Sequence, residues 1–498
     1  MFTQSAKHFL DSFSKIVPAV CVIHGSKVTV LRWRGKCKRP KKTPLHKLKK
    51  QDFLLVNFCP QDERIFVEHH LATVSIRTLC ELANGGSLKT KYFEQMMMEK
   101  LHLDYHRVFI DMAGDFRYFS TVFWQNADRL IKNVWKAMDK YNLWYSLMLE
   151  IRFVPLMHQM YGTPFPIDRH GIVSELKCIT DEMQELEQEL VYRYGFTEKE
   201  LSSTGEYGRE LEILAKYQKL KRVSGQFSVD KLFRTSPDRD AISCEIHSIG
   251  TASFRCSTSN INLYGLPKRL RKYLQARVGT EALTFDIHAS QIIILAWLSR
   301  EEKLIRVYES GKDIYKLIAS AMFSVKEDDV DERMRLAAKH CILIIINGGG
   351  IRSLSKELDG FGFSVAQVHQ IKDSLFAEFS KMESYVEKLK TAEVMRLPSG
   401  RMWFAGDNMP ESSHKRLSII LQGIEAEVLK SSLYLLSREI KGFERTELYM
   451  SLHDSIAIET VKGNSGKLQE LVRNCILDSF RMYFPDAKNI IIKQEELP

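Results

Sequence analysis

Two aspartates stand at the ends of apolar, strand-like runs that lie far apart in the chain. Asp286 is the last residue but one of the run "EALTFDI" (281–287), and Asp454 lies between the two alternating halves of "ELYMSLHDSIAIETV" (447–461). A carboxylate beside a buried strand costs free energy unless a cation or a donor compensates it. Two such carboxylates are the ligands that paired divalent cations use to activate a 3′-hydroxyl and to stabilise a leaving pyrophosphate. From the aspartates alone, the simpler interpretation that each one ends its strand is favoured by about three to one.

A row of side chains in "DERMRLAAKHCILIIINGGG" adds to the chemical interpretation. Arg335, Lys339, Leu343 and Asn347 recur every four residues and therefore share one face of a helix. Two cations, an apolar surface and an amide in one row would bind a triphosphate at one end and a flat base at the other. Taken alone, the row is equally typical of the solvated start of a buried helix.

The elements that must position these residues can be predicted from periodicity. We expect a strand over 281–287, a helix over 290–311, and a helix over 331–350 that stops at its three glycines. The alternation on both sides of His453 and Asp454 predicts a β-hairpin with these two residues at its tip.

Two further regions frame this central part. The first 140 or so residues mix short strand-like runs with amphipathic helices, which predicts an α/β unit. Two apolar stripes over about 170–222 predict an antiparallel helical hairpin that projects from the body. We expect Thr180 and Asp181 to cap its first helix.

Composition sets broad limits on the class of protein. The 498 residues are 44% hydrophobic and 27% charged, which is ordinary for a soluble globular protein of two or three domains. The excess of 72 Lys+Arg over 62 Asp+Glu leaves a nucleic-acid partner at about even odds. The nine cysteines form no C-x-x-C pair, which favours a reducing compartment. No apolar run approaches a membrane span, so we expect a cytoplasmic protein, with an organelle as the open alternative.

Several segments occur in the order in which one known family carries its motifs. "DIHASQIIILAWLS" (286–299) aligns without a gap with that family's motif A, the four-residue row followed by "GGG" has the spacing of motif B, and "LHDS" (452–455) stands at motif C. The chain thus resembles the family A DNA polymerases, those similar to bacterial DNA polymerase I, and more closely their short bacteriophage and prophage branch. The resemblance covers roughly 140–498 and includes five further segments: "FVPLMHQMYGTPFPID", "TASFRCSTSNINLYGLP", "GKDIYKLIASAMF", "LPSGR" and "LQGIEAEVLK".

The resemblance implies a catalytic role for each matching position. Asp286 and Asp454, with the main chain at Ile287, would bind two Mg²⁺ ions, for which Mn²⁺ could substitute. Arg335 and Lys339 would hold the incoming triphosphate, and Lys339 would also give a proton to the leaving pyrophosphate.

The resemblance also implies contacts to nucleotide and DNA. Four residues would surround the incoming nucleotide: Tyr315, Gln291, Leu343 and Asn347. Three would contact the minor groove of the primer-template, where acceptors common to all correct pairs report geometry rather than sequence: Arg255, Gln422 and His453.

Four residues depart from the family pattern. Gln291 replaces the motif A glutamate, Asn347 the motif B tyrosine, Phe254 the glycine before Arg255, and Ser455 the motif C glutamate. The first two would lie in the nucleotide pocket, where we expect Gln291 to exclude ribonucleotides and its amide to meet that of Asn347.

The N-terminal region occupies the place of the family's 3′-to-5′ exonuclease. "FWQNADRLIKNVW" resembles the last helix of that domain, and Asp128 matches one of its carboxylates. Proofreading also uses two metals and needs a D-x-E on the first strand, but no D-x-E occurs in residues 1–150. The region is therefore interpreted as a structural remnant.

The expected fold is α+β: a right-hand polymerase with an antiparallel palm sheet, fingers and a helical thumb, preceded by an α/β, ribonuclease H-like remnant of the exonuclease. The expected divisions are residues 1–140 for the remnant, 141–280 for the thumb and the start of the palm, 281–300 for motif A, 301–390 for the fingers, and 391–498 for the rest of the palm.

The expected function is DNA-directed DNA polymerisation from dNTPs without proofreading, by a monomer that binds primer-template DNA. Replication accessory proteins are the further partners that could bind it. One alternative is a weakly active or inactive polymerase-fold protein that binds primer-template DNA as a replication accessory factor. Another is a template-independent or RNA-templated polymerase.

Overall fold

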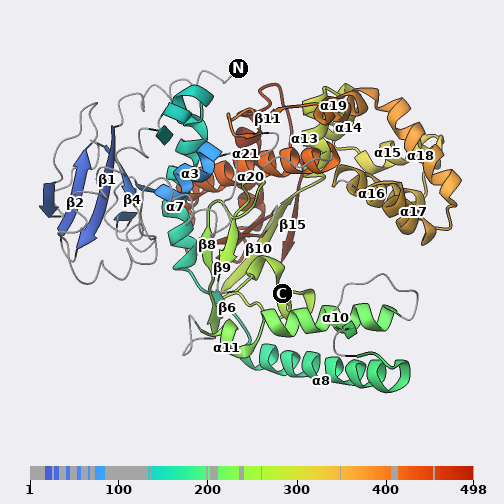
Figure 1. Cartoon of the computed structure of the whole chain (residues 1–498), viewed down its shortest axis with the longest axis horizontal. Coiled ribbons are helices and arrows are strands. Elements are labelled where there is room, and N and C mark those ends of the chain that lie inside the picture. The colour runs from blue at the N-terminus through green and yellow to red at the C-terminus, as the bar shows by residue number, and fades with distance from the viewer. Residues whose placement is uncertain are drawn as a thin grey trace.

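The computed structural model describes the main chain over fifteen stretches, and side chains for most of them. These stretches are 17–24, 27–32, 41–44, 53–57, 66–67, 73–84, 133–134, 136–197, 200–201, 211–234, 240–259, 261–347, 349–404, 413–452 and 455–496. In Figure 1 the N-terminal strands lie on the left, and a central sheet lies in the middle. Two groups of helices extend to the right.

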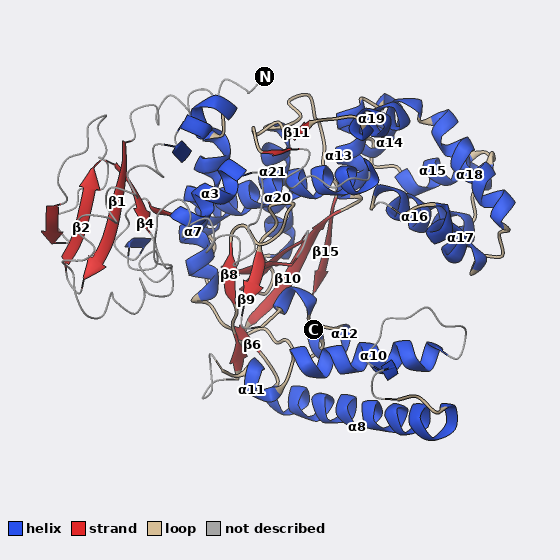
Figure 2. Ribbon diagram, viewed as in Figure 1, coloured by secondary structure: helices blue, strands red, loops and turns tan. Residues whose placement is uncertain are grey.

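The central sheet contains the two strand regions that the sequence predicts. Its four strands run in the order β13-β14-β10-β15, and all neighbours are antiparallel. Figure 2 shows two of these strands, β10 and β15, in the middle of the molecule. Their bounds are Glu447–Leu452 (β13), Ser455–Val461 (β14), Thr280–Ile287 (β10) and Ile492–Glu496 (β15). The predicted strand over 281–287 is confirmed as β10. The two strands of the predicted hairpin around 453–454 are confirmed as β13 and β14.

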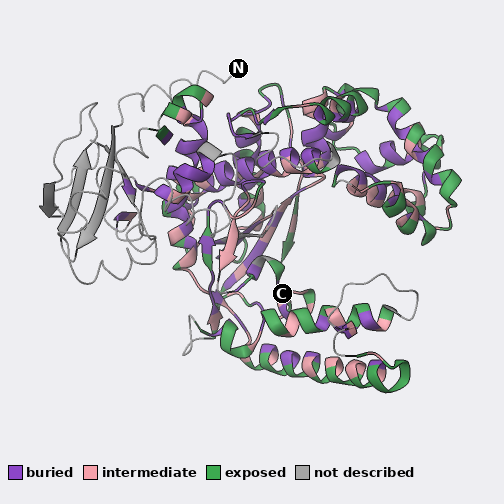
Figure 3. Cartoon of the chain, in the orientation of Figure 1, coloured by how far each residue is buried: buried purple, intermediate pink, exposed green. Residues whose placement is uncertain are grey.

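Long helices pack behind this sheet. Helix α20 contacts α21, α7, α13 and strand β14, and α21 contacts β10. Figure 3 shows that α20 is buried along most of its length. This helix therefore joins several parts of the fold. The bounds are Trp144–Tyr161 (α7), Ser290–Ser299 (α13), Ser413–Glu439 (α20) and Ser465–Arg481 (α21).

The helix expected over 290–311 is two helices, α13 and α14 (Glu302–Glu309). Arg300 adopts the left-handed conformation with φ 59°, and the amide of Glu301 donates to the carbonyl of Ala296 at 2.8 Å. This is the bond that closes a Schellman-type helix end. Because an arginine takes the position that glycine usually fills, periodicity did not signal the break.

The right-hand group of helices in Figure 1 continues from α14. The expected helix over 331–350 is confirmed as α16, which begins after Asp331 and ends before the glycines. Asp331 accepts a hydrogen bond from the amide of Met334 at 2.7 Å and so caps the helix. The helices of this group are α15 (Ile314–Phe323), α16 (Glu332–Ile346), α17 (Ile351–Asp359), α18 (Val365–Glu378) and α19 (Ser380–Lys390).

The predicted helical hairpin is confirmed as α8 (Arg169–Tyr194) and α10 (Leu211–Gln226), which pack on each other. Figure 1 shows the pair projecting from the lower side of the body. The expected cap was wrong, because Thr180 and Asp181 lie inside α8. Asp168 caps the helix instead, accepting from the amide of Gly171 at 2.9 Å.

The N-terminal region has the mixed sheet that an α/β unit requires. Its order is β3-β2-β1-β4-β5, with β1 antiparallel to β2 and parallel to β4. Helix α3 follows β5 and contacts α7. The bounds are Val17–His24 (β1), Lys27–Arg32 (β2), Lys41–Pro44 (β3), Phe53–Asn57 (β4), Thr73–Ser75 (β5) and Ile76–Asn84 (α3).

Short elements complete the described part of the chain. Three two-stranded sheets pair β6 with β7, β8 with β9 and β11 with β12. Of the described helices, none is long and apolar enough to cross a membrane. The short elements are β6 (Phe165–Pro166), β7 (Ala241–Ile242), β8 (Glu245–His247), β9 (Ser257–Ser259), β11 (Val394–Arg396), β12 (Met402–Phe404), α11 (Val229–Leu232), α12 (Lys268–Arg271), η3 (Leu263–Gly265), η4 (Glu327–Asp329) and η5 (Ile440–Gly442).

Candidate active site

Asp286 lies near the end of the central strand β10. Its Cα partners in the sheet are Ser455 on β14 and Lys493 on β15. Alternate residues of β10, including Phe285 and Ile287, are buried, whereas Asp286 is half-buried. The alternation therefore turns Asp286 away from the packed face of the sheet.

The turn that follows Asp286 is held by Tyr308 of α14. The Tyr308 hydroxyl donates to the carbonyl of His288 at 3.0 Å and accepts from the amide of Ile491 at 3.1 Å. Burial raises the pKa of this hydroxyl, and the nearby Asp286 carboxylate raises it further. Tyr308 therefore stays protonated and fixes the main chain between Asp286 and α13.

Tyr315 is the point where three segments meet. Its ring is 4% exposed and lies 5.6 Å from the His288 ring, centroid to centroid. The Arg335 guanidinium carbon lies 5.7 Å from the ring centroid, and the Lys339 ammonium nitrogen lies 5.8 Å from it. Burial raises the pKa of Tyr315 to about 12, and its hydroxyl is influenced by the Arg335, Asp313 and Asp286 charges. The structure thus brings the strand end with Asp286 and the basic row of α16 to one place.

Asp313 orients Arg335, a role that the sequence reasoning missed. One carboxylate oxygen of Asp313 accepts from the Tyr315 amide at 2.9 Å, and the other accepts from Nε of Arg335 at 2.5 Å. Burial would raise the pKa of Asp313, but the hydrogen bonds from Arg335 and from the amides of Tyr315 and Lys316, together with the Arg335 charge, outweigh burial and lower this pKa. An aspartate directly before an apolar helical run is an N-cap signal that could have identified this residue.

The surroundings of His288 show the sign of the local potential. Burial, together with the positive charges of Lys493, Arg335 and Lys339, lowers its pKa to about 4, against the opposing effect of Asp313. Of the charges that shift this pKa, three are cations and one is a carboxylate, so the charges around His288 favour an added anion.

The lower part of the α16 row reaches the long helix α20. Leu343 is half-buried and Asn347 is exposed. The Asn347 amide nitrogen donates to the carbonyl of Leu343 at 2.9 Å, and its amide oxygen accepts from the Ser418 hydroxyl at 3.3 Å. Oε1 of Gln291 is buried without a hydrogen-bond partner in the described part of the chain. The expected amide contact between Gln291 and Asn347 is therefore absent, because Asn347 pairs with its own helix and with Ser418.

Helix α20 also receives the segment that contains Arg255. Gln422 accepts from the Ser253 hydroxyl at 3.1 Å and donates to Ser418 at 2.9 Å. Glu425, one turn further along, accepts hydrogen bonds from Arg255 and from Ser290. Arg255 thus contacts α20 about one turn away from Gln422.

Phe254, which departs from the family's glycine, has a positive φ of 59°. A bulky residue is strained in this region by roughly 1–2 kcal/mol. Its ring is fully buried, lies 5.2 Å from the Trp403 ring, and has the Arg401 guanidinium 4.4 Å above it. Packing therefore compensates for a main-chain conformation that suits glycine.

Three residues singled out from the sequence lie outside the described residues: Asp454, His453 and Asp128. The neighbours of the first two are described, and Leu452 and Ser455 are Cα partners across the hairpin. Within the described stretches, no three His, Cys, Asp or Glu residues form a group that could hold a metal ion. The metal ligands that the resemblance implies include Asp454, which is not among the described residues.

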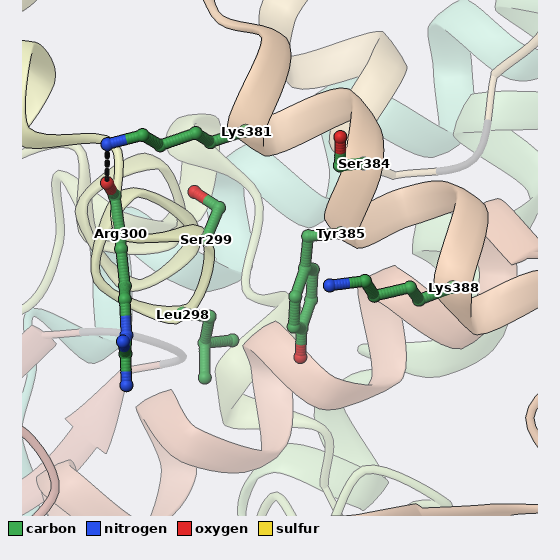
Figure 4. Close-up of a pocket in the computed structure, with 7 residues that line it drawn as sticks. All are labelled: Leu298, Ser299, Arg300, Lys381, Ser384, Tyr385 and Lys388. Carbon is green, nitrogen blue, oxygen red and sulfur yellow. Dashed lines mark hydrogen bonds between the residues drawn. The ribbon is translucent and has the colours of Figure 1, made fainter.

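A pocket of about 310 Å³ opens elsewhere, between the end of α13 and helix α19. The Lys381 ammonium donates to the carbonyl of Arg300 at 3.2 Å, and Figure 4 shows Lys388, not Lys381, beside the Tyr385 ring. Its lining contains none of the site residues expected from the sequence, so cavity volume does not locate the candidate site. The lining residues are Leu298, Ser299, Arg300, Lys381, Ser384, Tyr385 and Lys388.

Comparison of the fold with solved structures identifies its class. The POL domain of Pol1 from M. smegmatis, solved in complex with DNA primer-template and dNTP, matches with a TM-score of 0.75 and 15% sequence identity, covering 99% of this chain and 96% of that one. At this identity the match shows the fold, which is that of a polymerase domain. The family model for DNA polymerase family A matches residues 193–485, more than half of the chain. The chain belongs to DNA polymerase family A.

Curated relatives agree with this family. The thermostable DNA polymerase I of Thermus filiformis is 25% identical over 293 residues, which are 55% of this chain and 35% of that protein. DNA polymerase I of Chloroflexus aurantiacus is 24% identical over 264 residues, 49% of this chain and 28% of that one. The chain thus spans about a third of the length of the curated relatives that it matches.

Proposed function

We propose that this chain is a DNA-directed DNA polymerase that extends a primer with dNTPs. The observation that carries the proposal is the meeting of Arg335, Lys339 and Tyr315 beside the strand end with Asp286. A carboxylate and two cations at one place, on a polymerase-domain fold, suit the transfer of a nucleotide from a triphosphate.

The proposed metal ligands are Asp286, the main-chain carbonyl of Ile287 and Asp454. All are oxygen donors, which Mg²⁺ prefers and Mn²⁺ accepts. Two such ions, when bound, would activate the primer hydroxyl and stabilise the leaving pyrophosphate. The register supports the pairing of the two aspartates, because Asp454 directly precedes Ser455, the Cα partner of Asp286.

Arg335 and Lys339 would bind the triphosphate of the incoming nucleotide. Asp313 holds Nε of Arg335, which fixes the direction of the guanidinium before substrate arrives. Lys339 lies on the same face, and its ammonium would donate a proton to the leaving pyrophosphate. Tyr315, on whose ring both cations lie, would flank the phosphates.

The nucleotide and the DNA would contact residues on either side of this centre. Leu343, Asn347 and Gln291 would line the pocket for base and sugar. Arg255, Gln422 and His453 would contact the minor groove of the primer-template, and the shared contacts of Arg255 and Gln422 with α20 support that placement.

We further propose that residues 1–140 are a remnant of the proofreading exonuclease, and that the chain belongs to the bacteriophage and prophage branch of the family. The mixed N-terminal sheet supports the first proposal, and the ungapped motif A and B spacing supports the second. The thumb and the start of the palm would occupy 141–280, motif A 281–300, the fingers 301–390 and the remaining palm 391–498.

A primer-extension assay tests the proposed function. The purified chain is given Mg²⁺, dNTPs and a labelled primer on a DNA template, on an RNA template, or with no template. We expect extension on DNA. Extension only on RNA, or only without a template, would assign the activity to another class of polymerase, and no extension with intact DNA binding would favour an accessory protein.

The same assay without dNTPs tests for proofreading. A primer with a 3′ mismatch should stay full length, because a single carboxylate, Asp128, is insufficient to hold two metals. Shortening that is lost in Asp128→Ala would show that the N-terminal region is a working exonuclease.

A further inference from the structure

Glu425 is a buried carboxylate that connects two segments of the candidate site. It is 1% exposed and lies on α20 between two donors. Arg255 donates to one of its oxygens, and the Ser290 hydroxyl donates to the other. Ser290 is the first residue of α13, the helix that follows Asp286.

The polar face of α20 shows why Glu425 is placed to act on Arg255. Ser418, Gln422 and Glu425 recur at spacings of four and three and so share one face. Ser418 bonds to Asn347 at the end of α16, and Gln422 bonds to Ser253. Ser418 thus contacts the end of α16, whereas Gln422 and Glu425 both contact the segment that contains Arg255. Glu425 is the charged one of the three.

Arg255 is held but not covered. Its side chain is 24% exposed, whereas that of Glu425 is 1% exposed. A planar guanidinium anchored on a buried carboxylate has a fixed direction and loses little freedom when it meets a further acceptor. An arginine without that anchor would move to follow an acceptor that is displaced.

We propose that Glu425 is a positioning residue for mispair discrimination: it fixes Arg255 toward the primer-template and couples it, through Ser290, to the helix behind Asp286. The inference rests on the proposed function. A correct pair presents its minor-groove acceptor where a fixed Arg255 can reach it, and a mispair displaces that acceptor. Rigidity of Arg255 therefore converts a shift in geometry into a lost hydrogen bond.

The test measures kcat/KM for extending a 3′-paired primer and a 3′-mispaired primer, and takes their ratio. Glu425→Ala should lower this ratio at least ~10-fold. Arg255→Ala should lower it similarly, and the double variant should show no further loss because both act through one contact. Glu425→Gln should keep the ratio within ~3-fold of the parent, since an amide oxygen still accepts from Arg255.

Glu427 provides the matched control. It lies two residues further along α20, is fully buried, and binds Arg401 and Ser399 rather than Arg255. Glu427→Ala should lower the thermal midpoint of unfolding, as Glu425→Ala does, but leave the ratio unchanged. If Glu425→Ala does not fold, Glu425→Asp takes its place, because a shorter carboxylate keeps the charge but withdraws from both donors; its ratio should fall at least ~3-fold.

The outcomes separate this inference from the proposed function. A parent protein that extends neither primer overturns the proposed function, and the inference with it. A parent that extends primers while Glu425 variants keep the full ratio overturns the inference alone. Additive losses in the double variant would also overturn it, since Glu425 would then act independently of Arg255.

Discussion

Phe254 shows how one residue departs from the family pattern without breaking the local conformation. Its main chain keeps a φ of 59°, a value that suits glycine. The buried ring fills space that a glycine would leave empty. The sequence identified the departure but not its compensation, because Trp403 and Arg401, which pack on the ring, are distant in the chain.

At position 254 a glycine variant should be more stable than an alanine variant, which reverses their usual order of stability. Phe254→Ala loses about 3–5 kcal/mol of packing and keeps the strained φ. Phe254→Gly loses the same packing but relieves the strain, so it should be the more stable variant by about 1 kcal/mol. Urea unfolding of both variants measures the difference.

Phe153 is the control for that experiment. It is equally buried but lies inside helix α7. There the glycine variant should be the less stable one by about 1 kcal/mol. The same order at both positions would contradict the claim that Phe254 is strained.

Gln291 should exclude ribonucleotides. Its Oε1 is buried, so the side chain turns inward rather than into solvent, and glutamine keeps nearly the length of the family's glutamate. Gln291→Ala should raise the use of rNTP relative to dNTP by at least ~10-fold, about 1.4 kcal/mol of discrimination. Single-nucleotide incorporation with each substrate measures this ratio. An unchanged ratio would show that motif A places another residue under the sugar.

At the scale of single residues, regular spacing along the chain predicted which residues share a face. It did not predict which side chains pair with one another. The four-residue row of α16 was evident because a helix repeats its face at that interval. Asp313 and Glu425, which hold Arg335 and Arg255, were missed, since a partner that is distant in sequence leaves no local pattern.

At the scale of elements, strong periodicity predicted which helices and strands exist. It did not predict the residues at which they begin and end. Strand β10, helix α16 and the hairpin of α8 and α10 were all expected. The break between α13 and α14 was missed because Arg300 adopts φ 59° without a glycine to signal it. The cap of α8 was misplaced because the helix begins earlier, directly after Asp168, in a turn that contains few apolar residues.

The base of helix α8 should show a defined pH dependence. The Lys272 ammonium, together with Arg269 and the Tyr273 hydroxyl, lowers the pKa of Glu175 from 4.5 to about 2 in spite of burial. A folded pKa below the unfolded one means that Glu175 stabilises the protein above pH 4.5 and that this contribution is lost as the pH falls toward 2.

Glu175→Gln should therefore lower the free energy of unfolding by about 1–2 kcal/mol at pH 7, after allowance for the partly exposed Lys272 and Arg269. The difference from the parent should shrink between pH 4.5 and 2. Chemical unfolding at a series of pH values measures it. Glu185→Gln, an exposed position on the same helix, is the control; a pH-independent difference for Glu175→Gln would contradict the assigned pKa.

At the scale of the whole molecule, the order of strands was beyond prediction from periodicity. Strand β15 comes last in the chain, yet it pairs with β10 and places Lys493 opposite Asp286. Such pairing depends on long-range packing, which one sequence does not display. The resemblance to a known family supplied the polymerase part of the architecture in advance, and the fold match shows the fold of a polymerase domain.

The central claim is that Asp286 and Asp454 are the two carboxylates of a polymerase centre. Its most direct test is primer extension by Asp286→Asn and Asp454→Asn, with DNA affinity measured in parallel. Asp478→Asn, a change at a carboxylate that is 63% exposed on α21, is the control. We expect both site variants to lose nucleotide addition while binding DNA like the parent, because each removes a metal ligand and few DNA contacts. Substantial extension by either site variant would contradict the claim.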